Sequence, residues 1–89
     1  METEGAIQKL LRIPEGYSTG YFQNLQYKII KTSCIGGRSQ KIEALQMGGN
    51  DYISCNIYFT TDKVHFKPCE MPLDKILDFI LGFSLQPEN

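Results

Sequence analysis

Two hydrophobic periodicities divide the chain, with helical spacing near both ends and strict alternation between them. The alternation is clearest over about 52–60, where Ile53 and Ile57 alternate with polar or tyrosine side chains, as in a strand with one buried face. Glycine pairs at 36–37 and 48–49 are typical of hairpin turns. The same reasoning predicts strands over about 20–23, 26–33, 39–47, 52–60 and 64–67.

Helical spacing over about 4–13 and about 72–83 predicts one helix before the strands and one after them. Pro14 ends the first pattern, and Pro72 stands where the first turn of a helix favours proline. The apolar side chains of the second helix span an arc of roughly 200°, about twice the arc that one sheet covers. Either the N-terminal helix or a second copy of the chain covers the remainder. We expect a homodimer with this helix at or beside the interface.

Together these elements predict a single α+β domain over residues 1–89. It has a short N-terminal helix, an antiparallel meander of about four to five strands, and a C-terminal amphipathic helix packed on the sheet. Leu45 and Met47 break the alternation of the 39–47 segment, which predicts a bulge near Ala44. The least accessible side chains should be Ile53, Ile57, Phe59, Phe66, Ile76 and Ile80.

Cationic residues gather in the middle of a chain whose net charge is −1. Residues 20–67 carry six cationic and three anionic side chains, whereas the two ends are acidic. Lysine mixed with tyrosine on a sheet suits single-stranded nucleic acid, because the charge meets phosphates and the rings stack on bases. Equally, tyrosine is an ordinary β-former and lysine an ordinary guard of sheet edges. The side chains expected on the outward face are Lys28, Lys41, Tyr52, Tyr58, His65 and Lys67.

The order of elements, meandering strands followed by one helix, resembles single-stranded-DNA-binding regulator folds, which pair as dimers through that helix. We therefore expect a small, non-enzymatic, homodimeric binding or regulatory module, with single-stranded nucleic acid as a candidate partner of the outward face. Fold alone does not fix function. No apolar run approaches the ~20 residues that span a bilayer, so we expect no membrane association.

The alternative is a thiol-dependent enzyme or redox sensor that uses Cys69. This cysteine lies near Lys67 and shortly before the helix expected at Pro72, and both a cation and a helix N-terminus favour a thiolate. Glu70 opposes them, and no second cysteine lies two or three residues away. The sequence holds no C-x-x-C pair, so we expect no metal site and no cofactor. The other cysteines, at irregular spacing, make no disulfide framework, which favours a cytoplasmic location.

Two segments, 45–58 and 67–72, resemble a family of short, uncharacterised bacterial proteins, and Lys75 and Phe79 follow them. The family carries an LGG-x-D-x-(I/V)-S-x-N-x-Y segment and then L-K-P-C-E-M-P. The resemblance covers roughly the last two thirds of the chain, with departures such as Met47 before the glycines. It implies no established activity and transfers no catalytic residue. Some members carry a methionine sulfoxide reductase label, but the glycine-cysteine-phenylalanine-tryptophan motif of that activity is absent and the chain has no tryptophan.

Overall fold

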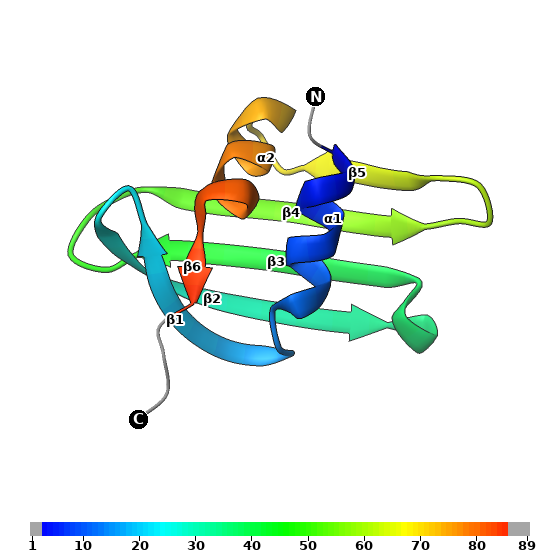
Figure 1. The fold of residues 1–89 in the computed structure, drawn as a ribbon, viewed down its shortest axis with the longest axis horizontal. Helices are drawn as coiled ribbons and strands as arrows, with labels where there is room; N and C mark the ends of the chain where they lie inside the picture. Colours follow the sequence, from blue (N-terminus) through cyan, green and yellow to red (C-terminus); the bar gives the residue numbers. More distant parts are fainter. Residues whose placement is uncertain (1–2, 86–89) are drawn as a thin grey trace.

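The computed structural model describes residues 3–85 and shows a six-stranded antiparallel sheet with both helices on the same face (Figure 1). The strand order is β5-β4-β3-β2-β1-β6. The α+β class is confirmed, with one strand more than the sequence predicted. The elements are α1 (Thr3–Arg12), β1 (Gly16–Phe22), β2 (Leu25–Cys34), the 3₁₀ turn η1 (Ile35–Gly37), β3 (Ser39–Gln46), β4 (Tyr52–Phe59), β5 (Val64–Pro68), α2 (Leu73–Gly82) and β6 (Ser84–Leu85).

Positive-φ residues form the sharp reversals between the first three strands. Gln23 and Asn24, with φ of 52° and 64°, close the β1–β2 hairpin, one residue earlier than the alternation suggests. Asparagine tolerates this left-handed region because its short side chain bonds locally. At the next reversal Gly36 and Gly37 have φ of 60° and 89°, which is the conformation that a glycine pair permits at no steric cost.

β1 begins at Gly16, four residues before the predicted strand. Its first residues pair with the far end of β2, and Tyr17 lies opposite Ile30. The sequence did not indicate this start for two reasons. Pro14-Glu15-Gly16 is typical of a turn, and the residues that follow it include few aliphatic side chains that would mark a strand. The strand therefore extends the sheet further than the sequence indicates.

The predicted bulge near Ala44 is wrong. β3 pairs without interruption with β2 and β4, and Ala44 lies opposite both Ile29 and Ile53. Leu45 stays in register opposite Lys28, on the side of the sheet away from the helices, where it is exposed. The alternation breaks because an apolar side chain occupies an outward position, while the backbone keeps its register.

The core fills the space between the two helices and the sheet face that they cover. Four of the six predicted core side chains, all isoleucines, are at most 1% exposed. Phe59 and Phe66 are only half-buried, because they lie at the end of β4 and on the edge strand β5. The buried apolar residues are Ala6, Leu10, Ile13, Tyr27, Ile29, Ile42, Ala44, Ile53, Cys55, Ile57, Ile76, Leu77, Phe79, Ile80 and Phe83.

The broad apolar arc of α2 is covered within the chain. α1 packs against α2, and its Ala6 and Leu10 are fully buried. The sequence left two alternatives for covering the apolar arc of α2, the N-terminal helix or a second copy of the chain. In the structure the N-terminal helix α1 covers it. Burial of α2 therefore requires no second copy of the chain, and the homodimer stays a prediction.

Two lysines hold the C-terminal ends of the two helices. Lys9 on α1 donates from Nζ to the carbonyls of Leu81 and Phe83, at 2.6 and 3.0 Å. Lys31 on β2 donates to the carbonyls of Leu10 and Ile13, both at 2.9 Å. Carbonyls at a helix C-terminus have no partner within the helix, and a cation there also complements the helix dipole. Lys31 occupies an inward position of β2, where no neighbouring residue of the strand satisfies its charge. Burial lowers the pKa of its ammonium, an effect that Glu15 opposes.

Candidate functional site

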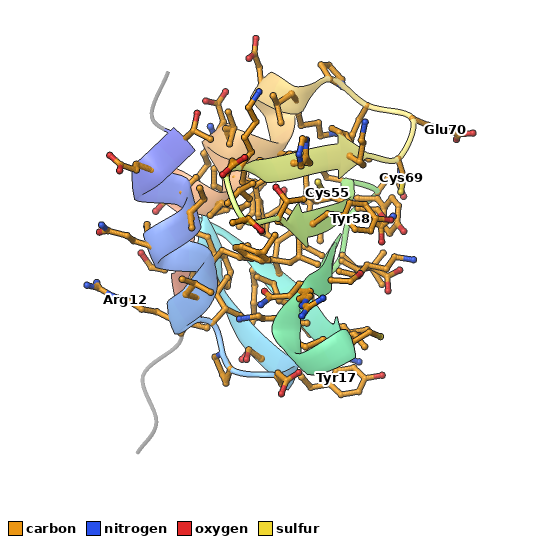
Figure 2. The ribbon with its side chains drawn as sticks, turned by 90° about the vertical axis from the view of Figure 1, so that its right-hand side faces the viewer. Arg12, Tyr17, Cys55, Tyr58, Cys69 and Glu70 are labelled. Carbon is orange, nitrogen blue, oxygen red and sulfur yellow. The ribbon has the colours of Figure 1, made fainter. Side chains whose placement is uncertain are left out.

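No helix among residues 3–85 covers the sheet face opposite α1 and α2 (Figure 1), and we call it the open face. Figure 2 shows the helices on one side of the sheet and Tyr17 and Tyr58 on the other. Because successive side chains of a strand point to opposite faces, the outward positions alternate with the buried ones that form the core. The open face is therefore made of the outward side chains of β1 to β5.

The structure brings all six predicted site residues to this face. The register places Lys28 opposite Leu45, and Leu45 in turn opposite Tyr52. A second cross-strand row contains Lys41, Asn56 and Lys67, and a third contains Cys34, Ser39, Tyr58 and His65. These rows lie at right angles to the strands, so they run across the sheet from β2 or β3 to β4 or β5.

Aromatic side chains lie on both sides of the lysine row. Tyr52 and Tyr58 are six residues apart on β4, which corresponds to about 20 Å along a strand. Lys41 and Lys67 flank Asn56 from the two neighbouring strands, so their backbones are roughly 10 Å apart. A polymer chain lying along β4 would meet a ring, a pair of cations and a second ring in turn.

Two further tyrosines on β1 belong to the open face and were missed at the sequence level. Tyr17 and Tyr21 are both exposed, Tyr17 by 69%. The Nζ atom of Lys28 lies 5.0 Å from the centre of the Tyr17 ring, within the range of a cation–π interaction. Tyr21 lies within the predicted strand 20–23 but was not assigned to the site, whereas Tyr17 precedes that strand. The alternation of Tyr17, Thr19 and Tyr21 is the signal that could have found both. Of the five tyrosines, only Tyr27 points into the core.

The charge of the open face is positive. Among the outward side chains of the described strands, Glu43 is the one carboxylate, against three lysines. Glu43 accepts a hydrogen bond from the hydroxyl of Tyr52 at 3.3 Å. The carboxylate thus lies beside one ring, while Lys41 and Lys67 lie nearer the other end of the face.

Two hollows mark the end of the open face where β3 begins. A shallow one of about 750 Å³ adds Arg38 to the predicted site, beside Tyr58. Arg38 precedes β3, and its carbonyl accepts a hydrogen bond from the Phe59 amide at 2.8 Å, which fixes its backbone next to β4. A smaller hollow of about 200 Å³ is lined by Thr32, Cys34, Ser39, Gln40, Lys41 and Asn56.

Cys69 lies in the loop after β5, beside the open face. Its amide donates to the Ser54 carbonyl at 3.0 Å, and the Asn56 side-chain amide lies 3.8 Å from its sulfur. Cys69 stands three residues before Pro72, the N-cap of α2, so it lies outside the first turn of that helix. His65 is four residues away along an extended segment, roughly 13 Å, and is not positioned as a base for the thiol.

The other two cysteines have opposite environments. Cys34 is exposed at the end of β2, while Cys55 is buried on the inward face of β4. Burial, above all, raises the pKa of the Cys55 thiol to about 11, so it stays protonated at neutral pH. Within residues 3–85, no group of three or more histidine, cysteine or acidic side chains is placed to hold a metal ion.

Tyr27 and Lys75 form a structural bracket around Asp51. Its carboxylate accepts a hydrogen bond from the Tyr27 hydroxyl at 2.6 Å and forms a salt bridge with Lys75 of α2 at 2.8 Å. The turn before it is tight, since a Cβ on Gly49 would lie 2.4 Å from the Gln46 side chain. The bracket joins β2, the β3–β4 turn and α2.

The bracket shifts the pKa values of Asp51 and Tyr27. The hydrogen bonds from Lys75 and then Tyr27 lower the pKa of Asp51. Burial and the hydrogen bond to Asp51 raise the pKa of Tyr27 to about 12. The carboxylate and the phenol are therefore held in their ordinary neutral-pH states. This arrangement stabilises the fold and has no group ready to exchange a proton near pH 7.

The geometry thus gathers exposed tyrosine rings and lysine side chains on one face of the sheet. None of the helices within residues 3–85 is long and apolar enough to cross a bilayer. A scan against protein-family models matches no family, and searches of curated proteins and of solved structures find no significant match to this chain.

Proposed function

We propose that this chain is a small, non-catalytic binding module whose open face binds single-stranded nucleic acid. The observation that carries the proposal is the gathering of four exposed tyrosines and three lysines on one uncovered sheet face. Proteins that bind single strands combine cations that follow the phosphates with aromatic rings on which bases stack. An unpaired strand can lay its bases flat on such a surface, whereas a duplex keeps them stacked on each other.

The expected mode of binding is independent of base sequence. The energy comes from stacking, about 1–3 kcal/mol per base, and from phosphate neutralisation, and neither depends on the identity of the base. Three lysines neutralise at most about three phosphates, which gives a log–log salt slope of about −2 for a single strand. Affinity should therefore be modest and should fall noticeably between low and physiological salt.

The test is fluorescence anisotropy with a labelled oligonucleotide of about twelve nucleotides at several salt concentrations. Tyr52→Ala and Tyr58→Ala should weaken binding at every salt concentration, because stacking does not depend on ions. Lys41→Ala and Lys67→Ala should also flatten the salt slope, by about 0.7 each. Arg12→Ala is the matched control, since Arg12 is an exposed cation on α1, on the other side of the sheet (Figure 2).

The result that retires the proposal is an absence of binding at tens of micromolar protein in low salt. Equal loss for Arg12→Ala and Lys41→Ala would likewise reject a defined face, because it would reduce the interaction to net charge. Either outcome leaves a protein or small-molecule partner for the open face. Circular dichroism of each variant shows whether the fold is kept.

A further inference from the structure

A hollow of about 270 Å³ lies in the helix layer, on the other side of the sheet from the open face. Its floor is apolar, since Ile13, Ile80 and Phe83 are between 1% and 5% exposed. α1, α2 and β6 each contribute to its wall. The lining residues are Lys9, Arg12, Ile13, Ile80, Phe83, Ser84 and Leu85.

The charged side chains of the hollow are both cationic, and no acidic residue lines it. Lys9 is fixed there by its bonds to the Leu81 and Phe83 carbonyls, which use two of the three donors of its ammonium. The guanidinium of Arg12 forms no hydrogen bond or ion pair with residues 3–85 and extends outward from α1 (Figure 2). Its five donors are therefore available to a ligand at the mouth.

We propose that this hollow binds a small monocarboxylate with an apolar body, such as a short-chain fatty acid. The volume lies just below the ~300–1,000 Å³ of sites for drug-sized ligands, which suits a ligand of fewer atoms. The apolar body packs on Ile80 and Phe83, and the carboxylate meets Arg12 in a charge-assisted, two-pronged hydrogen bond.

Lys9, which bonds to the carbonyls at the C-terminal end of α2, offsets the repulsion that an anion in the hollow would otherwise meet. The last carbonyls of a helix carry partial negative charge and would repel a carboxylate. Because Lys9 bonds to the Leu81 and Phe83 carbonyls, it supplies a positive charge where that repulsion would act. The hollow shares no residue with the open face, so this proposal can be tested independently of nucleic-acid binding.

The test is a titration of isotope-labelled protein with hexanoate, followed by the NMR signals of the backbone amides. Hexanoate should shift the signals of Arg12, Phe83 and Leu85 in a saturable way. Hexan-1-ol, which lacks the charge, and acetate, which lacks the apolar body, should each bind at least about tenfold more weakly. The Arg12→Gln variant should lose about tenfold in affinity, because it keeps a polar side chain but no charge.

Arg38→Gln is the matched control, since Arg38 is the other arginine of the chain and lies by Tyr58 at the end of β3. It should leave hexanoate binding unchanged. Equal binding of hexan-1-ol and hexanoate would overturn the proposal, because the hollow would then be selective only for apolar groups. Unchanged affinity in Arg12→Gln, or shifts that do not saturate at tens of millimolar ligand, would overturn it as well.

Discussion

Removing the hydroxyl of Tyr27 should destabilise the fold through the bracket at Asp51. In Tyr27→Phe the ring keeps its packing against Phe79, whose centre is 5.1 Å away, so the lost interaction is the hydrogen bond to the carboxylate. Hydrogen bonds to charged groups contribute about 1.5–3 kcal/mol. Asp51 keeps its salt bridge to Lys75, so we expect a loss at the lower end, about 1.5–2 kcal/mol.

A double-mutant cycle with Asp51→Asn isolates the pair. Asparagine keeps an acceptor for the Tyr27 hydroxyl but removes the charge, and it also breaks the salt bridge to Lys75. The lysine and aspartate side chains of that salt bridge are 42% and 30% exposed, so the pair adds at most about 1 kcal/mol. We expect the double variant to be at least about 1 kcal/mol more stable than the two single losses predict. Urea unfolding followed by circular dichroism measures all four proteins.

The pH dependence gives the same prediction a second readout. The pKa of Tyr27 is raised from 10.0 to about 12 in the folded protein, so its contribution is fully present below pH 10 and is lost as the pH rises towards 12. The decline should be on the order of 3 kcal/mol, and the Tyr27→Phe variant should lack it. The pKa of Asp51 is lowered, so its contribution is present above about pH 4 and is lost below it. A coupling below about 0.3 kcal/mol together with identical alkaline profiles would refute the reasoning.

Four further outcomes follow from the structure. Replacing Ile57 or Ile76 with alanine should cost about 2–5 kcal/mol in urea unfolding, because both are fully buried; a loss under about 0.5 kcal/mol would contradict the core assignment. Lys31→Met should cost about 1–3 kcal/mol in the same assay, since it leaves two carbonyls at the end of α1 without their donor. Maleimide should label exposed Cys34 quickly and buried Cys55 only on unfolding, and rapid labelling of Cys55 in the folded protein would argue against the β4 register. Sedimentation equilibrium tests the predicted homodimer, and a mass of 10.1 kDa at micromolar concentration would reject it.

Local periodicity predicted the parts of the fold that depend on neighbouring residues. The alternation around Ile53 and Ile57 predicted which side chains of β4 point into the core. It therefore also predicted that Tyr52 and Tyr58 point outward. The sequence could not predict β6, because a two-residue strand is defined only by its pairing with Gly20 and Tyr21 more than sixty residues earlier.

The sequence also could not predict hydrogen bonds between polar groups that lie far apart along the chain. Lys31 stands in the inward row beside Ile29, where the pattern alone indicates a misplaced charge. Its partners are carbonyls 18 and 21 residues away, which no local pattern contains. The same limit hid the role of Asp51, whose partners Tyr27 and Lys75 are each 24 residues distant.

The packing of α1 against α2 also has a consequence for the order in which the chain folds. During synthesis α1 emerges before strands β1 to β5 and α2 after them, so Ala6 and Leu10 lack their partners on α2 until those strands have been made. The β-meander can pair as it emerges, but the part of its inner face that α2 covers stays exposed until α2 is added. Such non-local burial slows folding and exposes intermediates to aggregation. A chain truncated before Leu73 would therefore leave part of the apolar inner face of the sheet exposed and prone to aggregation.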